Sequence, residues 1–176
     1  MSQAVGPLYP HNGYAGFVRR TLALLLDAAI LALFVATSAA TWETLAPNDW
    51  LDGPPHAVFV VLIWLCVMAY VFGFRMTSRG TPGYRIVRIR YAPMIDGPSS
   101  TFALAYRAAM AVFLLLFFVL DHLWILFDPC RQAWHDKLSG FYVVKCRTQP
   151  IGTRRVVRRV INFFMLTFMV YEPVDN

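Results

Sequence analysis

The first long apolar run of the chain covers residues 21–42 and contains one charged residue, Asp27. A helix of this length crosses the roughly 30 Å hydrocarbon core of a bilayer. A cleaved signal peptide is the competing interpretation, because two arginines precede the run and small residues near its end resemble a cleavage site. Asp27 argues against it, since the apolar region of a signal peptide is short and uncharged. The pattern therefore predicts a membrane-spanning helix over about residues 17–42.

A second apolar run, residues 57–74, has no charged residue and ends at Arg75. It predicts a second spanning helix over about residues 57–75. The loop between the two runs contains acidic residues but no lysine or arginine, whereas arginines are frequent after residue 75. By the positive-inside rule, we expect the N-terminus and the segment after residue 75 to be cytoplasmic.

The third apolar stretch, residues 108–127 of a helix predicted over about residues 103–127, contains Asp121 and His122. It is just long enough to cross once. A single crossing would place the basic residues that follow it outside, against the charge bias of the first two spans. A re-entrant or interfacial hairpin removes this conflict, so both arrangements are carried forward.

Two short segments, residues 84–92 and 140–147, alternate as β-strands do. Val87, Ile89 and Tyr91 would share one face of the first strand, and Tyr142, Val144 and Cys146 one face of the second. If the two pair, both lie on the same side of the membrane. The alternative is that both are irregular linkers. Finally, residues 153–171 start with four arginines and continue with too few apolar residues for a span, so they predict a basic amphipathic helix at the interface, with a tilted crossing as the alternative.

The composition supports a membrane location, since 58% of the 176 residues are apolar and only 15% are charged. The net charge of +6 favours anionic lipid headgroups at the cytoplasmic face over nucleic acid as the partner, because the basic residues flank apolar runs. The three cysteines suggest neither a disulfide framework nor a metal site. No cofactor, metal or catalytic residue is predicted, and we do not expect an enzyme.

Several charges lie where lipid would make them unfavourable. A carboxylate near the middle of a membrane helix costs about 2.5 to 3.5 kcal/mol, so Asp27 needs a partner. Arg20 lies seven residues earlier on the same helical face, and Arg107 is the other candidate. Arg107 and Asp121 would also share one helical face if the third helix is continuous. These charges either take part in transport or fix helix packing.

Three blocks of the sequence resemble the RDD family of small bacterial multi-pass membrane proteins, which is named for one arginine and two aspartates. Residues 14–30 resemble the opening helix, with Arg20 and Asp27 at two of the named positions. Residues 80–91 resemble the middle block, although Tyr84 stands where the family commonly has lysine. Residues 127–145 resemble the closing block, where Asp136 matches the second aspartate. The resemblance implies a membrane protein for which transport of ions or other ligands has been proposed.

These features predict an α-helical integral membrane protein of the bacterial plasma membrane, with two spanning helices, a third apolar segment, a short two-stranded β element and a C-terminal helix. It would comprise a cytoplasmic tail (1–13), a membrane domain (14–147) and a C-terminal extension (148–176). We expect either ion or small-ligand transport with Asp27 as a proton or cation exchange site, or a structural or regulatory subunit. Either role calls for a homo-oligomer or a membrane partner protein, because two spans cannot enclose a pathway and a re-entrant backbone must be shielded from lipid. The candidate residues are Arg20, Asp27, Arg107, Asp121 and Asp136.

Overall fold

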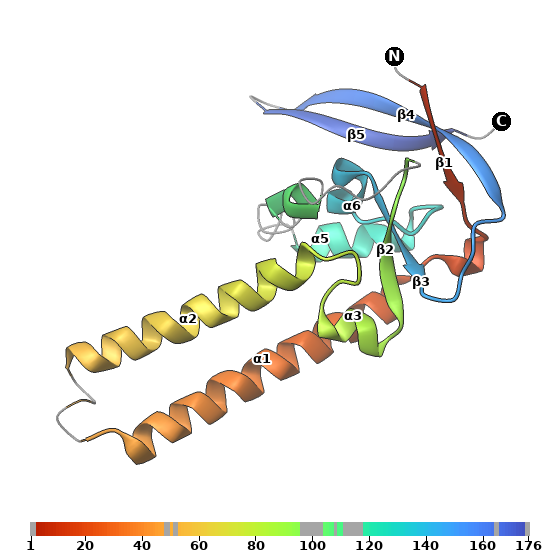
Figure 1. The fold of residues 1–176 in the computed structure, drawn as a ribbon. Helices are drawn as coiled ribbons and strands as arrows, with labels where there is room; N and C mark the ends of the chain where they lie inside the picture. Colours follow the sequence, from red (N-terminus) through yellow and green to blue (C-terminus); the bar gives the residue numbers. More distant parts are fainter. Residues whose placement is uncertain are drawn as a thin grey trace.

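Two long helices, α1 (Phe17–Leu45) and α2 (Pro54–Arg75), extend from one end of a smaller body of strands and short helices (Figure 1). The computed structural model describes residues 3–47, 50, 53–95, 104–107, 109–110, 118–163 and 166–174. Both long helices are long and apolar enough to cross a membrane, so the two helices predicted from the apolar runs are present. Each extends about one turn beyond its predicted bounds.

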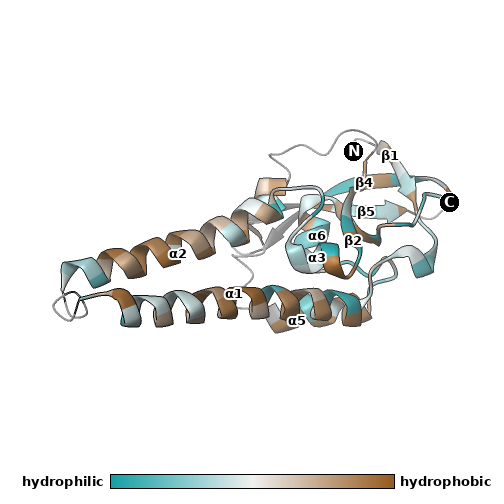
Figure 2. Cartoon of the chain, turned by 60° about the horizontal axis from the view of Figure 1, so that its bottom comes forward, coloured by the Kyte–Doolittle hydropathy of each residue, from teal (hydrophilic) through white to brown (hydrophobic). Residues whose placement is uncertain are grey.

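The surfaces of the two helices are those of lipid-facing spans. None of the residues of α2 is buried, and in α1 only Arg20, Ala23 and Asp27 are. The hydropathy colours of Figure 2 show that hydrophobic residues make up much of both helices. A surface of this size is stable in lipid and not in water, so the chain is a membrane protein. Only the first three turns of α1 contribute buried residues to the contact with the body.

At the centre of the body, β2 (Ile89–Pro93) and β3 (Phe141–Lys145) pair antiparallel, which confirms the predicted two-stranded element. Both faces of this ribbon are buried. Ile89 and Tyr91 pack with Ala23 of α1 on one face. Tyr142 and Val144 lie on the other, in a second core that also contains Tyr9, Tyr14, Ala92, Met94, Cys130 and Val156. The ribbon is therefore the layer between the membrane helices and the rest of the body.

The first of these strands is shorter than predicted. Residues expected to begin it form a short helix instead, α3 (Pro82–Ile86), so Val87 precedes the strand. The side chain of Thr81 accepts a hydrogen bond from the backbone N–H of Tyr84, and Pro82 occupies the first helical position. Both are standard signals for a helix start, and they override the alternation of the residues that follow.

The predicted C-terminal helix is wrong. β4 (Gly152–Phe163) and β5 (Leu166–Val174) form an antiparallel pair, and β1 (Gln3–Leu8), within the segment expected to be a tail, joins the other edge of β4. β-branched residues at positions 156, 157, 160 and 161 favour extended backbone, and β1 supplies a partner strand that local sequence does not reveal. The C-terminal segment is therefore part of a three-stranded sheet.

The third apolar stretch is described only at its ends. Residues 104–107 are helical, and α5 (Phe118–Leu123) continues into a single 3-10 turn, η4 (Trp124–Leu126). Residues 108 and 111–117 lie outside the described residues, so the crossing itself does too. A loop then leads to α6 (Trp134–Ser139). This helix ends at Gly140, whose positive φ of 71° suits glycine and directs the chain into β3.

Candidate functional site

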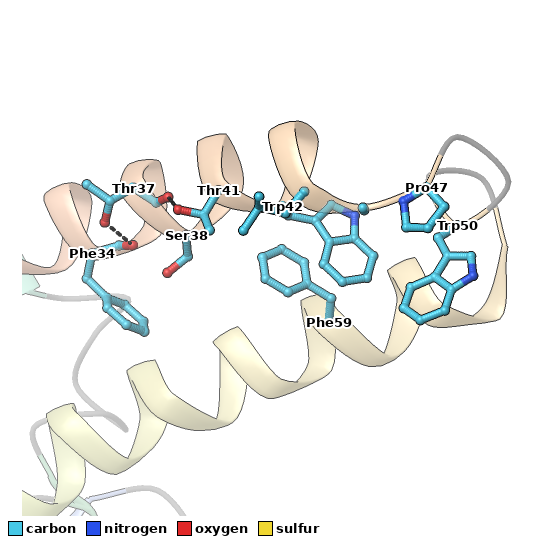
Figure 3. Close-up of a pocket in the computed structure, with 10 residues that line it drawn as sticks. Phe34, Thr37, Ser38, Thr41, Trp42, Pro47, Trp50 and Phe59 are labelled. Carbon is cyan, nitrogen blue, oxygen red and sulfur yellow. Dashed lines mark hydrogen bonds between the residues drawn. The ribbon is translucent and has the colours of Figure 1, made fainter.

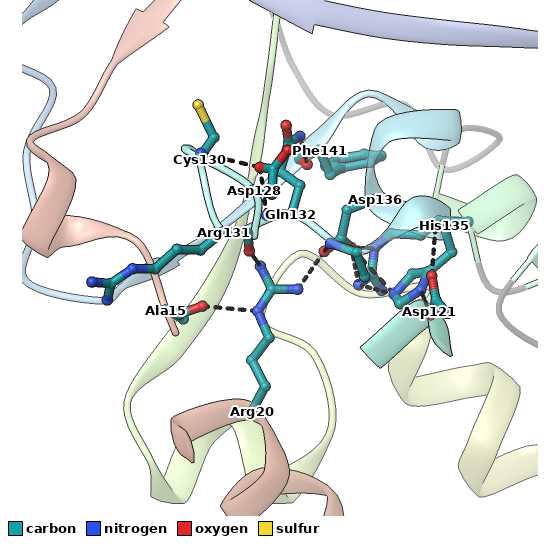
Figure 4. Close-up of polar contacts among 12 residues, drawn as sticks. Ala15, Arg20, Asp121, Asp128, Cys130, Arg131, Gln132, His135, Asp136 and Phe141 are labelled. Carbon is teal, nitrogen blue, oxygen red and sulfur yellow. Dashed lines mark hydrogen bonds and ion pairs between the residues drawn. The ribbon is translucent and has the colours of Figure 1, made fainter. Parts of the chain in front are cut away.

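A network of buried charges lies where α1 enters the body, with Asp136 of α6 at its centre (Figure 4). Asp136 is fully buried, and its two carboxylate oxygens have different partners. One accepts a hydrogen bond from Nη1 of Arg20, and the other accepts two from Arg107, at 3.0 Å from Nε and 2.5 Å from Nη2. An anion removed from water in this way is stable only when charged donors replace the lost hydration.

Arg20 connects three separate segments through one guanidinium. Besides Asp136, it donates from Nε to the backbone carbonyl of Ala15, at 2.9 Å, and from Nη2 to the carbonyl of Arg131. Ala15 lies just before α1 and Arg131 just before α6. The planar fork of an arginine can satisfy three such acceptors at once, whereas a lysine cannot. Arg20 therefore fixes the base of α1 against α6.

Arg107 is held from both sides. Its guanidinium carbon lies 3.9 Å from the centre of the Tyr91 ring, a cation–π contact with a residue of β2. Its Nη2 also lies 3.1 Å from Nε2 of His135. Nη1 is buried and has no hydrogen-bond partner among the described residues, so the ring face accounts for part of its stabilisation. The residue is completely buried and remains protonated at any physiological pH.

His135 links Arg107 to Asp121. Its Nδ1 lies 2.6 Å from Oδ2 of Asp121 in α5, and its backbone N–H donates to Oδ1 of the same carboxylate at 3.2 Å. In the tautomer with the proton on Nδ1, Nδ1 donates to Asp121 and Nε2 accepts from Arg107, whose guanidinium can only donate. Nε2 also lies 3.3 Å from Oδ1 of Asp136. The network contains two arginines and two aspartates, so their formal charges balance. Arg107 and Asp121 are thus connected, but through His135 and not through a common helical face.

The electrostatics of Asp136 follow from these contacts. Burial alone would raise the pKa of its carboxyl group, but Arg107 and Arg20 outweigh burial and hold the pKa well below its usual range. Asp136 therefore stays ionised throughout the physiological range. A group that does not change protonation state is suited to holding structure and not to releasing and binding protons.

Asp27 belongs to a different cluster, and the expected pairing with Arg20 or Arg107 is wrong. Both arginines bind Asp136 instead. The carboxylate of Asp27 accepts hydrogen bonds from the hydroxyl of Tyr70 in α2 at 2.8 Å, from the hydroxyl of Thr81, and from the backbone N–H of Gly83 at 2.8 Å. All three donors are neutral. Asp27 therefore joins α1 to α2 and to the start of α3.

Gly83 explains how α3 approaches α1 so closely. A β-carbon at this position would lie 2.2 Å from the carbonyl oxygen of Ala23 and 2.8 Å from the carboxyl carbon of Asp27. No side chain fits there, and Ala23 itself is fully buried. The Thr81 and Gly83 positions of the middle block thus have a direct role, which is to present one hydroxyl and one N–H to Asp27.

Sequence analysis placed Arg20, Arg107, Asp121 and Asp136 among the candidates, and the structure brings these four into one network with His135. It places Asp27 apart from them. The missed participants are the neutral ones, listed by cluster: His135 and Tyr91 beside Arg107, and Tyr70, Thr81 and Gly83 around Asp27. The adjacency of His135 to Asp136 was the available signal for the first cluster, and the Gly-Thr-Pro-Gly sequence of residues 80–83 for the second.

Neither cluster resembles a metal centre or lies beside the pocket. Among the described residues, no three His, Cys, Asp or Glu side chains are grouped as metal ligands would be. A pocket of about 500 Å³ lies at the opposite end of the helical pair, between α1 and α2 (Figure 3). Phe34, its lining residue closest in sequence to Asp27, follows it by seven residues, or about 10 Å along the helix. Aromatic and hydroxyl side chains predominate in its wall, among them Phe34, Thr37, Ser38, Thr41, Trp42 and Phe59.

Comparison with known proteins identifies the family of the chain. The model of the RDD family matches residues 14–140, which is well over half of the chain. The matched region contains both charge clusters and ends before β4 and β5. No curated protein and no solved structure matches the chain significantly. The chain therefore belongs to the RDD family.

Proposed function

We propose that this protein is a structural or regulatory membrane subunit, in which the buried charge network holds a cytoplasmic β-layer in a fixed orientation to two membrane helices. The observation that carries the proposal is the coordination of Asp136 by Arg20 and Arg107, both buried and both from other segments. A buried ion network adds little net stability over apolar packing, but it restricts the geometry in which its segments can pack. Such a joint suits a subunit that must present a surface in a defined position.

The proposed location is the bacterial plasma membrane, with a cytoplasmic N-terminus and a re-entrant third apolar segment. The distribution of arginines and lysines supports this orientation. The side chains of Arg107 and Asp121 support re-entry, because both contact the same imidazole ring. Fourteen residues of straight helix would separate their backbones by about 21 Å. This proximity of the two side chains supports a segment that re-enters on the side from which it leaves.

A second copy of the chain or a membrane partner protein is part of this proposal. The two long helices have few contacts with the body and leave an open, aromatic-lined pocket between them. Small residues line much of α1, and in lipid such residues allow close helix packing. No enzymatic reaction is proposed, because the charged groups are occupied by one another.

Proton or cation exchange at Asp27 is the second candidate. The observation that favours it is that the three donors to this carboxylate are all neutral, so its negative charge has no cation in direct contact among the described residues. A proton or a monovalent cation would neutralise it. Tyr70 and Thr81 have hydroxyl groups that can accept as well as donate, so the cluster can rearrange around a protonated carboxyl group.

A double-mutant cycle on Arg20 and Asp136 tests the structural role. We expect Arg20→Gln and Asp136→Asn each to lower the free energy of unfolding in detergent by about 3 kcal/mol, because each leaves a buried charge unpaired. The double variant should lose less than the sum of the two, by at least about 1 kcal/mol. Additive losses would show that the pair is not coupled and would contradict the proposal. Asp27→Asn, measured for cation and proton flux in liposomes, tests the second candidate separately.

A further inference from the structure

The β4–β5 hairpin has a strongly polar base and an apolar far end. The base contains the four arginines of β4: Arg154, Arg155, Arg158 and Arg159. Beyond them, residues 160–170 contain no charge, and nine of the eleven are apolar. The two polar residues, Asn162 and Thr167, are paired with each other across the strands. Charge and hydrophobicity are thus separated along the length of the hairpin and not between its faces.

The base of the hairpin contacts the body. Val156 is buried in the core that contains Tyr142, and Arg154 lies 3.6 Å from the sulfur of Cys130. Tyr171 of β5 packs over Gly140, at the end of α6. Val160 is on the same face of β4 as Val156, yet 63% of its surface is exposed. On this face, β4 therefore leaves the buried core between Val156 and Val160.

The direction in which the hairpin points relates it to the membrane helices. Figure 1 shows that the hairpin runs toward the side on which α1 and α2 leave the body. About four residues separate Arg159 from the end of β4, which corresponds to roughly 13 Å of extended chain. Interfacial segments bury their apolar residues about 5 to 10 Å below the headgroups. The reach of the hairpin matches the depth of the membrane interface.

We propose that the β4–β5 hairpin inserts its apolar end into the cytoplasmic leaflet and that its arginines bind the phosphate groups of anionic lipids. Arg155, Arg158 and Arg159 are exposed, although Arg158 also stacks on Tyr171 and Arg159 pairs with Glu172 at 3.3 Å. Guanidinium groups bind phosphate bidentately, and arginines next to an inserted apolar segment lie at headgroup level. Lipid fits this surface better than a second copy does, because a second copy would bring the same arginines against each other.

This inference requires the membrane location but neither of the two candidate functions. The hairpin lies outside the region matched to the family, which ends at residue 140. It would give this chain a second attachment to the membrane, so that the β-layer is held at the surface by α1 on one side and by the hairpin on the other.

Spin labels in nanodiscs test the proposal on the full chain. The three cysteines are replaced by serine, and a single label is introduced by Val160→Cys or, as the control, Ile151→Cys, which is 68% exposed and lies before the base. In discs of phosphatidylcholine and phosphatidylglycerol, we expect the label at position 160 to be accessible to oxygen and shielded from a water-soluble nickel complex. The label at position 151 should show the opposite.

The triple variant Arg155→Gln, Arg158→Gln, Arg159→Gln tests the headgroup contact. Each arginine near an anionic surface strengthens association by about fivefold, so their removal should return the label at position 160 toward water. Exposure to nickel at position 160 in the unmodified hairpin would overturn insertion. Equal shielding in phosphatidylcholine alone would overturn the role of anionic lipid. Dipolar broadening between labels on two copies would show that a second chain, and not lipid, covers the hairpin.

Discussion

Arg20 of α1 and Asp136 of α6 form a buried ion pair although 116 positions separate them in the chain. The pair joins the first turn of a membrane helix to a short helix of the body, and Arg107 completes the coordination of the same carboxylate. Arg20 and Asp136 are two of the three residues that resemble the positions for which the RDD family is named, and they bind each other. The third, Asp27, positions the loop that packs on α1 two turns further along.

Replacement of Arg107 by lysine tests whether the shape of the guanidinium matters as well as its charge. A lysine keeps the charge but cannot donate two bonds to Asp136, reach His135 and stack on Tyr91. We expect Arg107→Lys to lower the free energy of unfolding by about 2 kcal/mol, measured by chemical denaturation in detergent. Arg155→Lys, at an exposed position of β4, is the matched control and should change it by less than about 0.5 kcal/mol. Equal effects would show that Arg107 contributes only its charge.

Two glycines offer a matched test of the close approach of α3 to α1. Gly83→Ala would place a methyl group 2.2 Å from the carbonyl oxygen of Ala23, so the loop must move and Asp27 loses a donor. We expect a loss of about 2 kcal/mol in the free energy of unfolding. Gly73→Ala in α2 has no atom within 4 Å of the new β-carbon and should be neutral or stabilising, since alanine favours helix. Thermal unfolding of the two variants side by side measures the difference.

The stability of the protein should depend on pH through His122. Burial lowers the pKa of this imidazole, and Arg20 lowers it further. The ring lies 2.9 Å from the hydroxyl of Thr21 in α1. Because the pKa in the folded state lies below the ordinary value of 6.5, the stabilisation is present above about pH 6.5 and is lost as the pH falls. The unfolding temperature should therefore decrease below this pH.

His122→Gln should weaken that decrease, since the glutamine does not titrate. A pH profile of His122→Gln identical to that of the wild-type protein would assign the pH dependence to other groups.

Sequence patterns predicted the parts of this fold that depend on local physics. The two long helices follow from long apolar runs, and the β2–β3 pair follows from the alternation of side chains along two short segments. Side chains on both faces of this ribbon are buried. The prediction for the C-terminal segment was wrong because a run of arginines followed by apolar residues has the composition of an interfacial helix. Its strand conformation depends on pairing with β1, more than 140 residues away, and on the pairing of β5 with β4.

The candidate site was predictable in its residue types but not in its partners. Charged residues within or beside apolar segments can be recognised as candidates from the sequence, because a charge in lipid is energetically unfavourable. Helical spacing suggested Asp27 for Arg20, whereas Asp136 reaches it from α6 through tertiary folding. The neutral donors to Asp27 carry no sequence signal of this kind, since hydroxyl and backbone groups are common everywhere.

The reactivity of the cysteines tests the proposed orientation. In cells lacking Cys66, an impermeant thiol reagent should label the exposed Cys146 only after permeabilisation. Cys130 should react slowly even then, because it is buried and its pKa is raised by burial and by Asp128. Leu45→Cys, 77% exposed at the far end of α1, should be labelled from outside in intact cells. Labelling of Cys146 in intact cells would contradict the proposed orientation and indicate the inverted topology.

The most direct test of the structural role is ion movement in liposomes. Wild-type protein and Asp27→Asn would be reconstituted at equal density, and proton and monovalent cation fluxes measured with internal dyes over a range of pH values. The structural account predicts that the wild-type signal equals that of protein-free liposomes at every pH and under every gradient. Flux through wild-type protein that Asp27→Asn abolishes, with its fold intact, would contradict that account and establish Asp27 as an exchange site.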